Sequence, residues 1–159
     1  VTIDDFVASM ADANHFNFDT IMSWYSQSGT PEGSVDDEYN SELNIYSATF
    51  TQKNQTTPFL IPNKFGLLAD DGKEIETGMI LIDELVKTIS FENIKSKPTP
   101  SWFRGFSAPI KFDSNLSLSE KIFLSSNDSD PFNRWDNAQS LWLEYILNPE
   151  HVEEKELFS

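Results

Sequence analysis

The chain has 159 residues, and its 26 acidic and 11 basic side chains give a formal net charge of −15, which opposes binding to nucleic-acid phosphates or anionic membranes. It contains no Cys, so disulfides, thiolate zinc sites and cysteine nucleophiles are excluded. Hydrophobic residues form 38% of the sequence, including thirteen Phe and four Trp, which is enough for a core that needs neither metal nor disulfide.

The N-terminal stretch VTIDDFVASM lacks an initiator Met, and it also lacks the basic segment and apolar run of a signal peptide. We therefore expect the chain to begin partway along a longer polypeptide. No apolar run approaches the roughly 18 residues of a membrane-spanning helix, so no membrane partner is expected. The absence of Cys is typical of a reducing compartment, and a cytoplasmic location is predicted.

Two short helices are predicted at the N-terminus. Thr2 is placed to cap the first, and apolar residues then recur on one face at helical spacing: Phe6, Val7, Met10 and Ala13. A second helix is expected over residues 18–25, because the helix-ending residues Gly29 and Pro31 follow it.

The segment Trp24–Pro31, WYSQSGTP, lies where the helical spacing ends. Its serines and glycine resemble a reactive loop, but its position indicates a junction between a helical region and a strand-rich one. We expect Trp24 and Tyr25 to be buried anchors, with Gly29 and Pro31 setting the direction in which the chain leaves the helix.

Strands are predicted where the spacing of apolar residues changes from helical to alternating. In the first of them, Tyr46, Ala48 and Phe50 are expected to share one face, with Ser47 and Thr49 on the other. The predicted strands are residues 42–53, 59–69, 84–94 and 108–113, with a hairpin turn at Asp70–Lys73. Short strands separated by turns at intervals of about 8–12 residues favour a β-sandwich.

A second pair of helices is predicted near the C-terminus. One covers Ser117–Asn127, and Asp130 and Pro131 then supply the cap and first-turn residue of the next. Apolar residues follow at helical spacing: Trp135, Ala138, Leu141, Trp142, Tyr145 and Ile146. The acidic tail, residues 150–156, is expected to fray.

Metal ligands are scarce. The sequence has two His, His15 in a predicted turn and His151 in an acidic run, and neither belongs to a His-Glu-x-x-His motif. Both are interpreted as solvated surface residues. The segment Asp128–Asp130 resembles the start of a calcium loop, but Pro131 follows it and Gln139 stands where the twelfth-position Glu is required. Helix capping accounts for it better.

Other reactive arrangements are also weak. No Gly-x-Ser-x-Gly elbow occurs, and the carboxylates of Asp36–Glu38 and Asp70–Asp71 are expected in solvated turns. Arg104–Pro109 begins like an RNA-binding signature, but Ala108 replaces a stacking aromatic and Pro109 disrupts a sheet ladder. Three Asn-x-Ser/Thr triplets matter only in a secreted chain: Asn54, Asn115 and Asn127. The residues alone thus indicate a soluble, acidic, non-catalytic domain.

Five segments in order resemble bacterial aminopeptidase N (alanyl aminopeptidase), a zinc metallopeptidase of the gluzincin type. The likeness spans about residues 1–147 and is loosest between Thr51 and Lys97. The segments that carry it are Ile3–Phe6 with Met10 and Asp12–Ala13, Trp24–Pro31, Asp37–Asn40, Pro98–Ser101 with Arg104–Lys111, and Asp128–Trp135 with Ala138–Gln139.

The resemblance implies a mainly β fold, an immunoglobulin-like β-sandwich flanked by short N-terminal and C-terminal helix pairs. It assigns residues 1–31 to the last helices of the catalytic thermolysin-like domain, 32–114 to the sandwich and 115–159 to the start of the C-terminal helical domain. The family's zinc ligands, general base and substrate-binding motif all precede the segment that matches Val1. We therefore assign no catalytic, substrate-binding or metal residue here, and zinc only to the parent enzyme.

The leading hypothesis is therefore a non-catalytic spacer of a zinc aminopeptidase in peptide catabolism, inactive by itself, whose partners are the adjoining domains of the same chain. The alternative is a stand-alone immunoglobulin-like interaction module. A self-contained hydrolase lacks the required side chains. The apolar faces of the helices within residues 2–25 and 131–147 are expected to pack back on the sandwich or to associate between copies.

Overall fold

The computed structural model describes residues 2–14 and 22–147 of the chain. The strands are β1 (Glu32–Asn40), β2 (Ile45–Lys53), β3 (Ile61–Leu68), β4 (Glu74–Ile82), β5 (Val86–Phe91), β6 (Thr99–Ser101) and β7 (Lys111–Asp113). The helices are α1 (Ile3–Asn14), α2 (Ser23–Ser26), the 3-10 turn η1 (Arg104–Phe106), α3 (Leu118–Asn127) and α4 (Pro131–Leu147).

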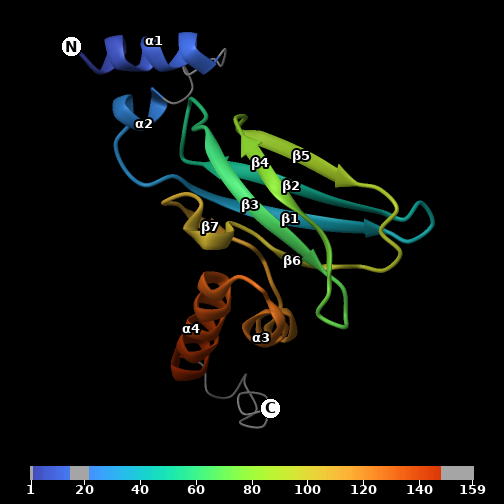
Figure 1. The fold of residues 1–159 in the computed structure, drawn as a ribbon. Helices are drawn as coiled ribbons and strands as arrows, with labels where there is room; N and C mark the ends of the chain where they lie inside the picture. The colour runs from blue at the N-terminus through green and yellow to red at the C-terminus, as the bar shows by residue number, and fades with distance from the viewer. Residues whose placement is uncertain (1, 15–21, 148–159) are drawn as a thin grey trace.

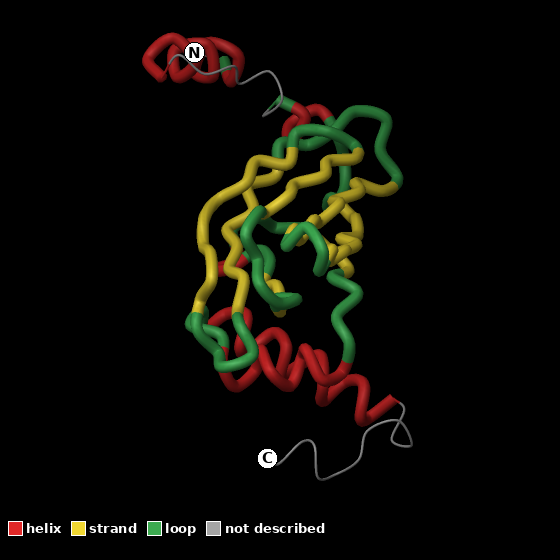
Figure 2. The backbone as a smooth tube through the Cα atoms, turned by 90° about the vertical axis from the view of Figure 1, so that its right-hand side faces the viewer, coloured by secondary structure: helices red, strands yellow, loops and turns green. Residues whose placement is uncertain are grey.

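Two sheets face each other. One has the strand order β5-β2-β1-β7 and the other the order β4-β3-β6; all pairs are antiparallel except β1 with β7. Figures 1 and 2 show α1 and α2 at one end of the sandwich and α3 and α4 at the opposite end. The expected fold class, an immunoglobulin-like sandwich flanked by helix pairs, is confirmed.

The core lies between the two sheets. Tyr46, Ala48 and Phe50 are fully buried, as their alternation in β2 predicts, and Ser47 and Thr49 point outward. The rings of Phe50 and Trp102 meet edge to face, with centroids 5.1 Å apart, which joins the two sheets through an aromatic contact.

Three strands depart from the sequence-based expectation: β1, β4 and β7. Asp36–Glu38 were expected in a solvated turn, but they lie within β1, where Asp36 and Glu38 face outward along the pair with β2. β4 was not predicted, because it is an edge strand exposed at seven of its first eight positions and therefore shows no alternation of apolar and polar residues. The predicted strand over 108–113 shortens to β7, which begins after Pro109.

The caps of the helices follow the sequence. Thr2 Oγ1 accepts a hydrogen bond from the backbone N–H of Asp5 at the start of α1. Ser117 and Glu120 form a capping box before α3, and Asp130 Oδ1 accepts from the backbone N–H of Asn133 in the first turn of α4. Local hydrogen bonds thus set where these helices begin.

The helical end of the Trp24–Pro31 segment is confirmed only in part. α2 covers Ser23–Ser26 and Met22 lies in a turn, whereas residues 18–21 of the predicted second helix lie outside the described residues. Trp24 is an anchor: its Nε1 donates to the carbonyl of Leu60 at 2.9 Å and its ring meets Phe59. The expected burial of Tyr25 is wrong, since this side chain is 63% exposed; a single helical turn directs neighbouring side chains to different sides.

The expected packing of the terminal helices back on the sandwich holds only in part for the described residues, because Trp24 meets Phe59 but large apolar side chains of α1 and α4 stay exposed. The alternative, association between copies, stays a prediction. Phe6 in α1 is 60% exposed, and Trp135 in α4 is 56% exposed. Leu141 is buried, because the opposite face of α4 packs against α3. Apolar surface therefore remains open at both ends of the molecule.

Gly29 gives a direct test of the junction. Its φ is +97°, and nothing lies within 4 Å of an added Cβ, so a side chain there meets backbone strain but no clash. We expect Gly29→Val to lower the free energy of unfolding by about 1–2 kcal/mol in urea titrations. Gly29→Asn should cost less, because Asn adopts positive φ more readily. Equal losses, or none, would contradict this explanation.

Candidate functional site

The most constrained polar site in the described residues surrounds Arg104. This arginine is only 4% exposed and begins η1, which follows β6 after Trp102 and Phe103. Its guanidinium fills the space over Gly66 of β3, where an added Cβ would lie 2.1 Å from Arg104 Cζ. The glycine thus leaves room for a buried cation against the backbone of the sheet.

Arg104 contacts two carboxylates. Its Nη1 donates to Glu74 Oε1 at 2.6 Å, and its Nη2 lies 2.8 Å from Asp128 Oδ1 in a charge contact without the alignment of a hydrogen bond. The side chain of Asp128 is fully buried, whereas that of Glu74 is 37% exposed. A buried cation is therefore balanced by one fully buried anion and one partly solvated anion.

Ser101 and Asn133 complete the polar cluster. Ser101 Oγ donates to Asp128 Oδ2 and accepts from Arg104 Nε at 3.1 Å. Asn133 Nδ2 donates to Ser101 Oγ at 2.7 Å and to the carbonyl of Trp102 at 2.8 Å. The five residues Glu74, Ser101, Arg104, Asp128 and Asn133 are called the Arg104 cluster below. They join β4, β6 and η1 of the sandwich to the end of α3 and the start of α4.

The electrostatics of the cluster favour charged Glu74. Hydrogen bonds from Ser129 and Arg104 lower the pKa of Glu74 below its usual value, although partial burial opposes them. The contribution of this carboxylate to stability is therefore present above the usual glutamate pKa and is lost as the pH falls through the folded-state pKa. Because the group is partly solvated, its contribution is modest.

A second ion-pair group holds α3 against the other sheet. Lys97 Nζ lies 3.2 Å from Asp37 of β1 and 3.6 Å from Glu120 of α3. Burial lowers the pKa of Lys97, but the hydrogen bond and charge of Asp37, together with Glu120, outweigh it and raise the pKa above the usual value. Burial raises the pKa of Tyr46 as well, and the nearby carboxylates of Asp37 and Glu120 add to this.

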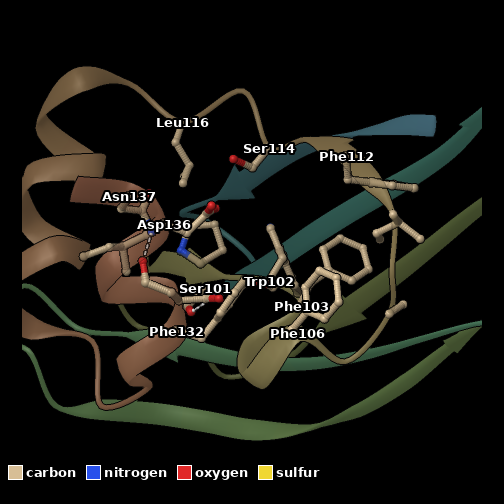
Figure 3. A pocket seen from close by; sticks show the side chains of 15 residues that line it. Ser101, Trp102, Phe103, Phe106, Phe112, Ser114, Leu116, Phe132, Asp136 and Asn137 are labelled. Carbon is tan, nitrogen blue, oxygen red and sulfur yellow. Dashed lines mark hydrogen bonds between the residues drawn. The ribbon is translucent and has the colours of Figure 1, made fainter. Parts of the chain in front are cut away.

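A hollow of ≈ 170 Å³ lies beside the Arg104 cluster, between the sandwich and the helices (Figure 3). Phe132, Asp136 and Asn137 of α4 face Ser101, Trp102 and Phe103 across it. Among its described lining residues, Asp136 is the one acidic or basic side chain, and burial raises its pKa. Ser101 and Ser114 also line the hollow, but in the part of the chain that the structure describes its lining holds no His or second titratable group to activate a hydroxyl, so it is a poor basis for hydrolytic chemistry.

The sequence-based candidates separate into three groups. His15 and His151 lie outside the described residues, and the described part contains no cluster of three or more His, Cys, Asp or Glu placed to hold a metal. Asp71 lies in the predicted hairpin turn and pairs with Lys73. Asp130 is a helix cap as expected.

Asp128 and Arg104 have a role that the sequence did not reveal. The sequence predicts Asp128 as a capping residue with Asp130. It places Arg104 in a failed RNA-binding signature and in a segment that resembles aminopeptidase N, with no ion-pair role for either residue. The structure buries both, so Arg104 contributes nothing to a basic surface. A possible signal was the isolation of Arg104 in an apolar stretch, Trp-Phe-Arg-Gly-Phe, where a lone cation requires an acidic partner.

Comparisons with known proteins assign this sandwich to a family. Residues 29–115, more than half of the chain, match the family model described as "Domain of unknown function (DUF3458) Ig-like fold". The chain belongs to this family. In the described residues, no helix of this DUF3458 protein is long and apolar enough to cross a membrane.

The relatives of this DUF3458 chain are aminopeptidases, as the sequence motifs indicate. Aminopeptidase N of Escherichia coli K12 is 34% identical over 91% of the chain, and that of Caulobacter vibrioides is 32% identical over 92%. The crystal structure of Legionella pneumophila aminopeptidase A in complex with aspartic acid superposes with a TM-score of 0.91, at 28% identity and 99% coverage. The chain spans 18% of each of the first two relatives and 19% of the third.

The Arg104 cluster predicts a large difference between two aspartates. Asp128→Ala leaves a buried guanidinium without its buried anion, so we expect the free energy of unfolding to fall by about 3 kcal/mol in urea titrations. Asp71→Ala is the matched control: it removes one carboxylate from the solvated pair with Lys73, and little change is expected. Similar effects of the two substitutions would contradict the role given to Asp128.

Proposed function

We propose that this chain is an internal, non-catalytic segment of a zinc-dependent aminopeptidase that removes N-terminal amino acids from peptides. The observation that carries the proposal is the extent of the likeness. Identity to aminopeptidase N covers 91–92% of the chain, whereas the matched family model covers only residues 29–115. The resemblance therefore includes helices on both sides of the sandwich as well as the sandwich itself.

The proposed segment joins two larger parts of the enzyme. Residues 1–31 close the catalytic domain, 32–114 form the immunoglobulin-like domain, and 115–159 begin the C-terminal helical domain. The exposed apolar side chains at the two ends of the molecule support this assignment, since Phe6 and Trp135 are surfaces suited to partner domains. The adjoining domains of the same polypeptide are its proposed partners, and the lack of Cys suits a cytoplasmic enzyme.

Zinc is assigned to the parent enzyme and not to this segment. The described residues do not fit the metal, because they offer no cluster of three or more His, Cys, Asp or Glu in a suitable arrangement. No catalytic step is therefore assigned to a residue of this chain. The role left for it is to hold the parts of the enzyme on either side in a fixed relation.

A comparison of two proteins tests the proposal. The full-length protein encoded around this segment and the 159-residue chain are assayed for hydrolysis of alanyl p-nitroanilide and for zinc by elemental analysis. We expect turnover and stoichiometric zinc in the full-length protein and neither in the chain alone. Turnover or stoichiometric zinc in the chain alone would contradict the spacer role. An inactive full-length protein made of repeated sandwiches would favour the alternative, a stand-alone interaction module.

A further inference from the structure

The two outward faces of the sandwich differ in chemistry. On the β5-β2-β1-β7 sheet, exposed hydroxyls pair across strands: Ser47 Oγ with Ser90 Oγ and Thr49 Oγ1 with Thr88 Oγ1, each at 2.9 Å. On the β4-β3-β6 sheet, the exposed side chains include Met79, which is 65% exposed. The first face also carries Val86, 56% exposed, but paired hydroxyls form its centre. The second face exposes more apolar area, which water disfavours.

The apolar face ends in a hollow. Leu81, two residues beyond Met79 on the same side of β4, forms its wall with Pro62 of β3 and Trp24 of α2. The loop at residues 107–109 closes the other side, and the space has a volume of ≈ 370 Å³. We define Trp24, Pro62, Met79, Leu81 and Pro109 as the β4 face. None of these five side chains is charged, but the exposed Lys64 of β3 lies opposite Met79 on the same side of the sheet. The face therefore suits a protein surface that is apolar around Leu81 and carries an acidic or polar group near Lys64.

The place of the β4 face in the fold indicates which surface covers it. α1 and α2 lie at one end of the sandwich, and α3 and α4 lie at the other (Figures 1 and 2). Trp24 of α2 forms one wall of the hollow, so the hollow lies at the N-terminal end of the sandwich. At that same end α1 presents Ile3, 51% exposed, and Phe6, 60% exposed.

We infer that the β4 face is the docking surface for the part of the polypeptide that precedes Val1, which under the proposed function is the catalytic domain. The chain covers only 18% of its aminopeptidase N relatives, so a protein of their length has ample chain to supply this occupant. The segment that follows α4 leaves from the opposite end. The hydroxyl face of the other sheet stays in water.

Cysteine labelling of the full-length protein tests whether the face is covered. Met79→Cys is compared with Thr88→Cys, an exposed position on the hydroxyl face. Maleimide modification is followed by mass spectrometry of the peptide that contains each position. In the native protein the cysteine of Met79→Cys should react at least about tenfold more slowly than that of Thr88→Cys, because the reagent reaches it only when the interface opens. In denaturant the two cysteines should react at equal rates. Equal native rates, or protection of Thr88→Cys as well, would overturn the inference.

Cross-linking then identifies the occupant. With p-benzoylphenylalanine in place of Met79, light should join this position to a peptide that precedes Val1 in the same molecule. Cross-links to α1, to the chain beyond Ser159 or to a second molecule would overturn the inference. Hydrolysis of alanyl p-nitroanilide by the unsubstituted full-length protein tests the proposed function separately. If the full-length protein is inactive but shows the expected cross-link, the proposed function is wrong and the docking surface stands. If the protein is active but Met79→Cys reacts as fast as Thr88→Cys, the docking surface is wrong and the proposed function stands.

Discussion

The contact between Arg104 and Asp128 is the constraint on which the arrangement of sandwich and helices depends. Arg104 is 4% exposed, so its guanidinium can stay charged only where an anion compensates for the hydration it has lost. Asp128, at the end of α3, is a fully buried anion in contact with it. Replacing such a pair with apolar residues is often neutral for stability, so we infer that the pair acts mainly by fixing where the helices lie. Any other position of the helix pair would leave buried charges without partners.

This constraint gives a physical account of a spacer. Ser101 and Asn133 extend the Arg104 cluster from β6 into α4, and Lys97 ties α3 to β1 by a second route. The C-terminal helices are thus linked to both sheets, more weakly through the half-exposed Lys97 than through the buried Arg104. At the entry, Trp24 fixes α2 to the start of β3 through Leu60. A body anchored at both ends sets the spacing of whatever is attached to it, which is the role we propose within an aminopeptidase.

The sequence predicted those features that depend on local chemistry. The capping residues Thr2 and Asp130 and the alternation in β2 all follow from neighbouring residues. Features that depend on distant residues were missed or misread. β4 is an edge strand without alternation, Asp36–Glu38 are acidic yet lie in β1, and the Arg104 cluster joins positions 74, 104 and 128, which no local pattern links. The polarity contrast of the two outer faces appeared only when the register of the strands was known.

The central claim is that the Arg104 cluster makes the sandwich and the α3–α4 pair one cooperative unit. Native-state hydrogen exchange of the 159-residue chain in low denaturant tests it most directly. We expect the slowest amides of β3 and of α4 to exchange through the same opening, with equal free energies and equal denaturant dependence. If the amides of α3 and α4 exchange through a separate opening of clearly lower free energy while β3 stays protected, the helices are only an appendage and the claim is wrong.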